Sequence, residues 1–123
     1  MRNLIILITV IILGSCSKSD SIEVKKGKIL FYSDAFVALN CKLDSISIYI
    51  NNNYKGKLSK SFLPLSQIPN ESDSNTLTII LPIGNYSFST KMAGCSSNKW
   101  DGTLEIVESE CKTVNLNYST SKP

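Results

Sequence analysis

Ser45-Ile46-Ser47-Ile48-Tyr49-Ile50 is the stretch that decides the fold of this chain. Its isoleucines alternate with residues that tolerate water, which is the period of a β-strand with one buried face. The same alternation recurs further along the chain, in segments 76–81, 86–89, 103–106 and 113–116. Ile29-Leu30-Phe31-Tyr32 is a continuous apolar run and is expected to be the first strand. No window of about eleven residues favours an amphipathic helix, so the pattern predicts an all-β fold.

Turn signals separate these segments. Asn51-Asn52 precedes a short return strand, Tyr54–Leu58, and asparagine tolerates the positive φ of a tight hairpin. Pro82-Ile83-Gly84-Asn85 is expected to join Thr76–Leu81 to Tyr86–Lys91 as a hairpin, with Trp100–Val107 returning antiparallel. Glu108-Ser109-Glu110 is expected to join the last two strands. Six or seven short strands at this spacing predict one small sandwich. We expect the sandwich to span 28–119, with a tail at 120–123.

The N-terminal segment has a different character. Arg2 precedes an apolar or near-apolar run, Leu4 to Leu13, which is too short for the roughly 20 residues of a membrane-spanning helix. The run leads into Leu13-Gly14-Ser15-Cys16, which resembles the lipobox of bacterial lipoproteins. The resemblance implies that residues 1–15 are a signal peptide that is removed and that Cys16 carries a thioether-linked diacylglycerol. An ordinary secretory signal cut near Ser15 is the main alternative, and a buried core helix is a weaker one.

Residues 16–27 are expected to be the lipidated cysteine and a flexible polar tether. Lys18 and Asp20 resemble in part the export signal of Bacteroidetes surface lipoproteins. The resemblance implies an outer-membrane protein and favours display at the cell surface over a position facing the periplasm. Asp20-Ser21-Ile22 and Asp44-Ser45-Ile46 resemble the O-glycosylation sequence of the same bacteria. Ser21 and Ser45 are therefore candidate glycosylation sites, and Ser21 is the more accessible of the two.

Longer blocks resemble PEGA-type domains, which are similar also to carboxypeptidase regulatory-like modules. The blocks that carry this resemblance are 47–56, Leu81-Pro82-Ile83-Gly84-Asn85-Tyr86-Ser87-Phe88, 100–106 and 111–116. The resemblance covers nearly all of the expected domain. It implies a small immunoglobulin-like or transthyretin-like sandwich of the kind found in bacterial surface lipoproteins.

Three cysteines remain after Cys16, and an extracytoplasmic compartment permits them to form a disulfide. The residues alone leave three single pairings open. The topology that the family resemblance implies brings Cys41 and Cys95 to one end of the sandwich and Cys111 to the other. We therefore expect a Cys41–Cys95 bond and a free thiol at Cys111.

Catalytic and metal chemistry has little support in this sequence. The chain has no histidine, which excludes Ser-His-Asp and Cys-His catalysis and any imidazole ligand. Asp101 and Glu105 share a strand face but lie about 13 Å apart by rise per residue, too far for glycosidase chemistry. The Ser-x-x-Lys spacings at Ser96–Lys99 and Ser119–Lys122 are attributed to chance. We expect no catalytic residue, no cofactor and no metal.

The charge pattern and two aromatic residues indicate which kinds of ligand the chain could bind. The net charge is +3, with lysines scattered among acids, which does not indicate a nucleic-acid interface. Phe62, in the long connection Ser61–Asn75, and Trp100 are candidate ligand contacts. The preferred alternatives are a loop folded over one sandwich edge and a tryptophan at the edge of the core.

These observations predict a non-enzymatic, membrane-anchored lipoprotein. It would be a binding or structural accessory module of the cell envelope, with membrane lipid and an envelope protein or glycan as partners. The alternative function is a small inhibitor or immunity lipoprotein that blocks an incoming enzyme.

Overall fold

The computed structural model describes residues 22–39, 42–62, 67–94 and 98–123. These residues form seven strands, a short helix and one 3-10 turn. In chain order the elements are β1 (Lys26–Ser33), α1 (Ala35–Ala38), β2 (Leu43–Ile50), β3 (Asn53–Leu58), β4 (Leu77–Pro82), β5 (Gly84–Gly94), β6 (Asp101–Ile106), β7 (Cys111–Leu116) and η1 (Tyr118–Thr120). The prediction of an all-β fold with six or seven strands is confirmed.

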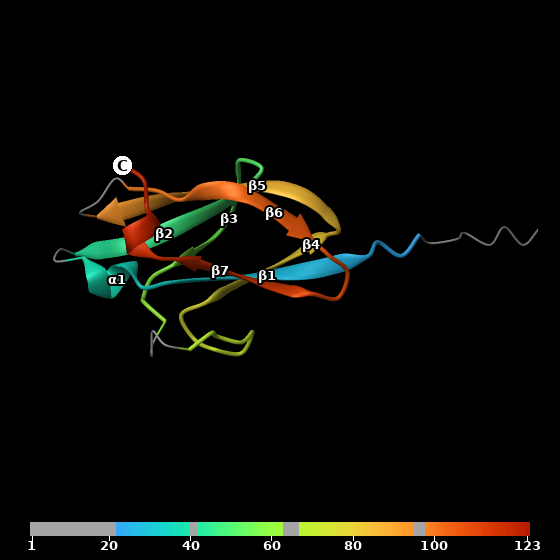
Figure 1. The fold of residues 1–123 in the computed structure, drawn as a ribbon, viewed down its shortest axis with the longest axis horizontal. Helices are drawn as coiled ribbons and strands as arrows, with labels where there is room; N and C mark the ends of the chain where they lie inside the picture. The colour runs from blue at the N-terminus through green and yellow to red at the C-terminus, as the bar shows by residue number, and fades with distance from the viewer. Residues whose placement is uncertain (1–21, 40–41, 63–66, 95–97) are drawn as a thin grey trace, which may run out of the picture.

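The strands form two sheets that lie one over the other (Figure 1). One sheet has the order β4-β1-β7 and the other the order β3-β2-β5-β6. All strand pairs are antiparallel except β1 and β7, which run parallel with Tyr32 opposite Asn115. The connections after β1, β3, β4 and β6 each carry the chain from one sheet to the other.

One expected pairing is wrong. Thr76–Leu81 and Tyr86–Lys91 were expected to form a hairpin, but β4 pairs with β1 while β5 pairs with β2 and β6. Only Ile83 separates the two strands, and its N–H donates to the Lys25 carbonyl at 3.0 Å instead of closing a hairpin turn. Gly84, with φ of 148°, turns the chain across to the other sheet. The expected antiparallel return of Trp100–Val107 is confirmed by the β5–β6 pairing.

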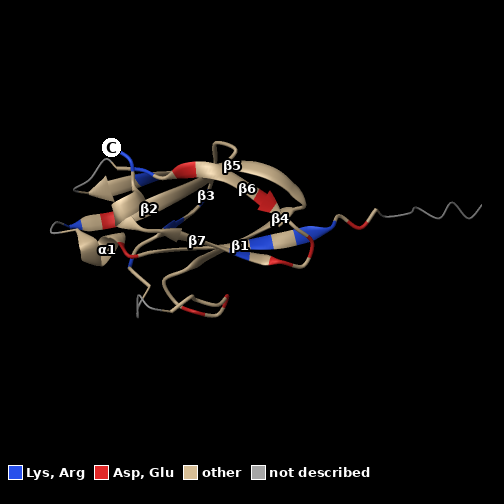
Figure 2. Ribbon diagram, viewed as in Figure 1, with Lys and Arg blue, Asp and Glu red and all other residues tan. Residues whose placement is uncertain are grey.

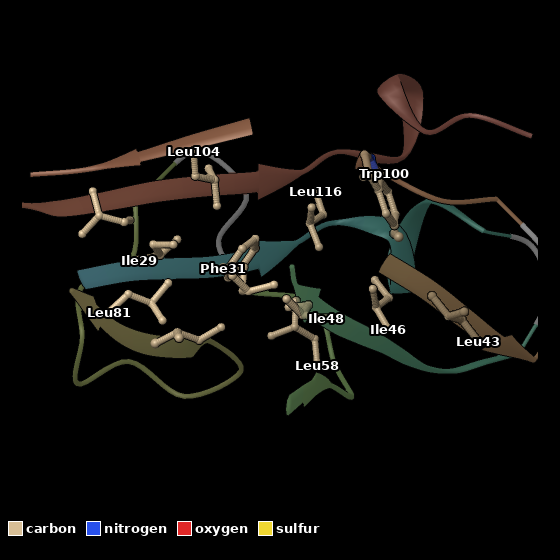
Figure 3. Packing of buried hydrophobic residues seen from close by; sticks show 14 residues of the cluster. Ile29, Phe31, Leu43, Ile46, Ile48, Leu58, Leu81, Trp100, Leu104 and Leu116 are labelled. Atoms are coloured by element: carbon tan, nitrogen blue, oxygen red, sulfur yellow. The ribbon is translucent and has the colours of Figure 1, made fainter. Parts of the chain in front are cut away.

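The core lies between the sheets (Figure 3). Ile46, Ile48 and Ile50 of β2 are buried, as their alternation predicts. They face the inner side of β1, where the ring of Phe31 lies 5.8 Å from that of Phe88 on β5. Apolar residues of β4, β6 and β7 fill the rest of this layer: Ile79, Leu81, Leu104, Ile106 and Leu116.

The strand β1 is buried on both faces, which explains its continuous apolar run. Leu30 faces away from the inter-sheet core and is still fully buried. On the same outer face, Tyr32 contacts the ring of Phe62 and Lys28 bonds to Glu71. Both partners belong to the connection between β3 and β4. The part of this connection that the structure describes therefore lies over the outer face of β1, the middle strand of its sheet, and not over an edge of the sandwich as expected.

The β2–β3 hairpin confirms the expected turn at Asn51-Asn52. The two asparagines have φ of 48° and 65°, the left-handed values that a two-residue type I′ turn requires. The Asn51 side chain also accepts a hydrogen bond from the backbone N–H of Ser87 at 2.9 Å. This bond fixes the hairpin against β5.

The sandwich has two ends of unlike composition (Figure 1). The entry end, where the chain enters β1, consists of Val24–Gly27, Ile83–Gly84 and Val107–Glu110. The far end consists of Ser33–Ala38, Trp100 and Asn117–Lys122, and it holds the C-terminus. Figure 2 shows charged residues of both signs close together at the entry end.

Candidate functional site

Trp100 closes the core at the far end. Its backbone N–H donates to Thr90 Oγ1 at 2.8 Å, and its indole N–H donates to the Asn117 carbonyl at 2.9 Å. The side chain is 5% exposed, so neither ring face is open to a stacking sugar. Trp100 thus takes the core-edge position that the sequence favoured over a carbohydrate platform.

A second set of bonds ties the corner between β1 and α1 to the end of β7. The buried hydroxyl of Ser33 donates to the Leu116 carbonyl at 2.8 Å and accepts from the Ala35 N–H at 3.0 Å. Asp34 accepts from the Tyr118 N–H at 2.8 Å through its side chain. These bonds join segments more than eighty positions apart in sequence, so they fix the far end as one unit.

Beside this corner, the outer face of the three-stranded sheet is hollowed into a small notch. Its lining is contributed by β1, β7 and the β3–β4 connection: Tyr32, Ser33, Asp34, Phe62, Asn115 and Asn117. Phe62 is 7% exposed and packs edge-on against Tyr32 with ring centroids 5.9 Å apart, so it forms a wall of the notch. The amide, carboxylate and phenol groups of the lining can bond to hydroxyl or peptide groups of a ligand.

Sequence reasoning identified only Phe62 of these residues. Tyr32 and Asn115 belong to segments far apart in the chain, and the parallel β1–β7 register makes them neighbours. The alternation of β7 does indicate that Asn115 faces away from the core, since Leu116 faces into it. Nothing in the local pattern identifies β1 as its partner.

The entry end is built differently. The Ile83 N–H donates to the Lys25 carbonyl at 3.0 Å, and the Ser109 N–H donates to the Lys26 carbonyl at 3.1 Å. A Cβ atom on Gly27 would lie 2.2 Å from the Val107 carbonyl oxygen, so only glycine permits this approach. The start of β1 is therefore held between two chain crossovers, with the side chains of Ile83 and Val107 directed outward and exposed.

Two exposed ion pairs accompany this end. Lys25 Nζ lies 2.9 Å from a Glu108 carboxylate oxygen, and Lys28 Nζ lies 2.6 Å from one of Glu71. The hydrogen bond to Glu71, together with its negative charge, raises the pKa of Lys28. Exposed pairs of this kind contribute little to stability, because solvent screens them.

Some of the residues considered for catalysis make exposed hydrogen bonds, and two of them, Asp101 and Lys122, bond to each other. Asp101 accepts a hydrogen bond from Lys122 Nζ at 3.0 Å, and the Ser119 hydroxyl donates to Asn117 Oδ1 at 2.6 Å. Ser96 lies outside the described residues. Among residues 22–39, 42–62, 67–94 and 98–123, no group of three or more cysteine or acidic side chains is arranged to hold a metal ion.

Several expected modification sites lie outside the described residues, namely Cys16, Ser21, Cys41 and Cys95. Ser45 lies on β2 opposite Ala93 and is half-buried. Cys111 is a free, exposed thiol at the start of β7, the position expected of it. Leu43 and Gly94, which follow and precede the expected disulfide pair in sequence, are opposite each other in the β2–β5 ladder. No helix in the described part of the chain has the length and apolar character needed to span a bilayer.

Comparison with known proteins identifies no relative: no family model, curated protein or solved structure gives a significant match to this chain. The resemblance to PEGA-type domains and to lipoprotein signal peptides therefore remains a prediction from the residues quoted above.

Proposed function

We propose that this chain is a non-enzymatic lipoprotein of the bacterial cell envelope, anchored through acylated Cys16 and acting as a binding or structural accessory module. The observation that carries the proposal is Leu13-Gly14-Ser15-Cys16, which follows an apolar run and is joined by a short polar segment to a compact sandwich. Two acyl chains anchor a protein stably where one chain does so only marginally. The outer membrane is the proposed location, with the sandwich facing the cell surface or the periplasm.

The far end is the proposed binding side. Its notch combines a Phe62 wall with the polar groups of Asp34, Asn115 and Asn117. The hydrogen bonds of Ser33 and Asp34 hold the lining in place before a partner arrives, which lowers the entropy cost of binding. A peptide segment of an envelope protein, or a glycan, offers the hydroxyl and amide groups that such a lining can bond.

The anchor is tested by metabolic labelling with a clickable fatty acid. The wild-type chain is expected to incorporate the label and Cys16→Ala is expected to lose it. Equal labelling of the two chains would contradict the anchor, because no other residue of the chain is proposed as an acceptor.

The binding side is tested by pull-down from solubilised envelopes with Asn115→Ala, which removes an exposed amide from the notch. Asn85→Ala is the matched control, since Asn85 is an exposed asparagine on β5 outside the notch. We expect the partner to be retained by the control and lost from Asn115→Ala. Equal retention by both would move the binding side elsewhere. Tight capture of a soluble enzyme would support the inhibitor alternative.

A further inference from the structure

Three apolar side chains are exposed at the entry end. Val24, Ile83 and Val107 are 55%, 49% and 42% exposed. Ile83 and Val107 line the same hollow, and Val24 precedes the lysine whose carbonyl bonds to the Ile83 N–H. Val24 lines a second hollow, which shares Glu108 with the first. Ile22, two positions before Val24, is almost fully exposed. Several exposed apolar side chains at one end of a domain are typical of an interaction site.

Charged residues of both signs lie at the same end, near the start of β1 and the end of β6 (Figure 2). Lys25 is paired with Glu108, and Lys26 lies beside this pair in the second hollow. Glu105 and Glu108 line the hollow that contains Ile83 and Val107. The surface thus offers ammonium groups to a phosphate and carboxylates to an ammonium, which complements the zwitterionic headgroup of phosphatidylethanolamine.

The chain outside the structure determines which surface is within reach of the bilayer. Ile22 follows Cys16 by six positions, and a fully extended chain of this length spans at most about 22 Å. If Cys16 is acylated, the entry end therefore stays near the membrane interface whatever path residues 17–21 take. The strand β1 runs from this end to the far end, so the notch lies on the side away from the attachment point (Figure 1).

We infer that the entry end rests on the membrane surface, with Val24, Ile83 and Val107 inserted among zwitterionic phospholipid headgroups. This inference rests on the proposed function, because the acyl anchor at Cys16 holds this end at the bilayer. It extends that function by assigning an orientation: the sandwich stands on its entry end and presents the notch of the far end away from the lipid.

The test uses the full chain, processed in a lipoprotein-producing bacterium and placed in vesicles of phosphatidylcholine and phosphatidylethanolamine. Val107→Trp puts a fluorophore on the entry end, and Val37→Trp puts one on α1 at the far end. Val37 is a matched control because it is also an exposed valine, at 56%. The native Trp100 is buried and contributes equally to both variants. Phospholipids brominated in their acyl chains quench only fluorophores that lie close to the bilayer.

We expect brominated vesicles to reduce the emission of Val107→Trp by about twofold and to leave that of Val37→Trp unchanged, as insertion at the headgroup boundary predicts. Equal quenching of the two variants, or none in either, would overturn the inference. Hydrogen exchange of the unsubstituted protein gives a second readout that does not depend on the folding of the variants. Vesicle binding should slow exchange at 22–25 and 107–110 and leave 35–38 unchanged, and the reverse pattern would equally overturn it.

Flotation separates this inference from the function on which it rests. Wild-type protein that floats with the vesicles, while Cys16→Ala does not, supports the anchor. Floating protein without selective quenching of Val107→Trp would refute the orientation and leave the anchor standing. Wild-type protein that fails to float would refute both.

Discussion

The two ends of the sandwich differ in how the edge of the core is covered. The far end is closed by buried side chains whose polar groups bond to distant backbone, as Trp100 does with Asn117 and Ser33 does with Leu116. The entry end is held by backbone bonds and exposed ion pairs, and its valine and isoleucine side chains remain exposed. Buried hydrogen bonds are costly to break, whereas exposed pairs are weak. The far end therefore contributes more to stability, and the entry end has exposed apolar side chains available for contact with a membrane.

The largest expected effect is at Trp100. If removing its side chain left stability unchanged, the far end would not be the more stabilising of the two ends. Trp100→Ala leaves a cavity at the far end and is expected to lower the free energy of unfolding by about 3–5 kcal/mol. Trp100→Phe is the control, because it keeps most of the ring and loses the indole N–H. The Asn117 carbonyl still accepts from Thr120 Oγ1, so the cost should be about 1 kcal/mol. Urea unfolding followed by circular dichroism measures both. A cost below that of the control would contradict the role of Trp100 in closing the core.

The second prediction concerns the cysteines expected to join at the far end. Cys41 and Cys95 lie outside the described residues, but the β2 and β5 residues nearest to them, Leu43 and Gly94, are opposite each other. We expect a Cys41–Cys95 bond that stabilises the fold by about 4 kcal/mol in the chain-entropy model, less any strain. Non-reducing peptide mapping identifies the bond, and unfolding with and without reductant measures its effect. A linked peptide containing Cys111 would refute the pairing, because Cys111 begins β7 at the opposite end of β1.

The next prediction, of intermediate size, concerns two buried serines that differ in their hydrogen bonding. Ser33 makes two hydrogen bonds at the far end, whereas the hydroxyl of Ser61, which is also buried, has no partner among the described residues. Ser33→Ala should lower the free energy of unfolding by about 1–3 kcal/mol, because it leaves the Leu116 carbonyl and the Ala35 N–H unpaired. Ser61→Ala should be neutral or stabilising, since it removes an unsatisfied polar group. Equal costs for the two variants would mean that burial of the serine, and not its bonding, determines stability.

The sequence predicts well which face of a strand is buried. The isoleucines of β2 are buried, while Ile80, which lies on the opposite face of β4 from Ile79 and Leu81, is exposed as its position requires. Asparagine at both central turn positions correctly locates the first hairpin. These features are local, because a side-chain period of two and a positive φ can be read from neighbouring residues.

The choice of strand partner could not be predicted in the same way. Alternation shows which face of β4 is buried but not whether its neighbour is β1 or β5, and the hairpin expected there is wrong. The notch depends on the same non-local choice, since Tyr32 and Asn115 meet only through the β1–β7 pairing. The bond from the Ala35 N–H to Ser33 is local, but the bond from Ser33 to the Leu116 carbonyl depends on how β1 and β7 meet and has no sign in the neighbouring residues.

The smallest expected effect lies toward the entry end, at Lys28 and Glu71. The hydrogen bond and charge of Glu71 raise the pKa of Lys28 above its ordinary value of 10.5. A pKa raised by folding adds stability that is complete below 10.5 and is lost as the pH rises through the higher value of the folded protein. The contribution of the raised Lys28 pKa to stability should therefore not change between pH 9 and pH 6, a range that lies about one unit or more below the pKa of lysine. NMR titration of the Lys28 side chain should show its pKa falling in Glu71→Gln and staying raised in Glu105→Gln, which removes an acid that does not bond to Lys28. An unchanged pKa in Glu71→Gln would show that Glu71 does not pair with Lys28 in solution.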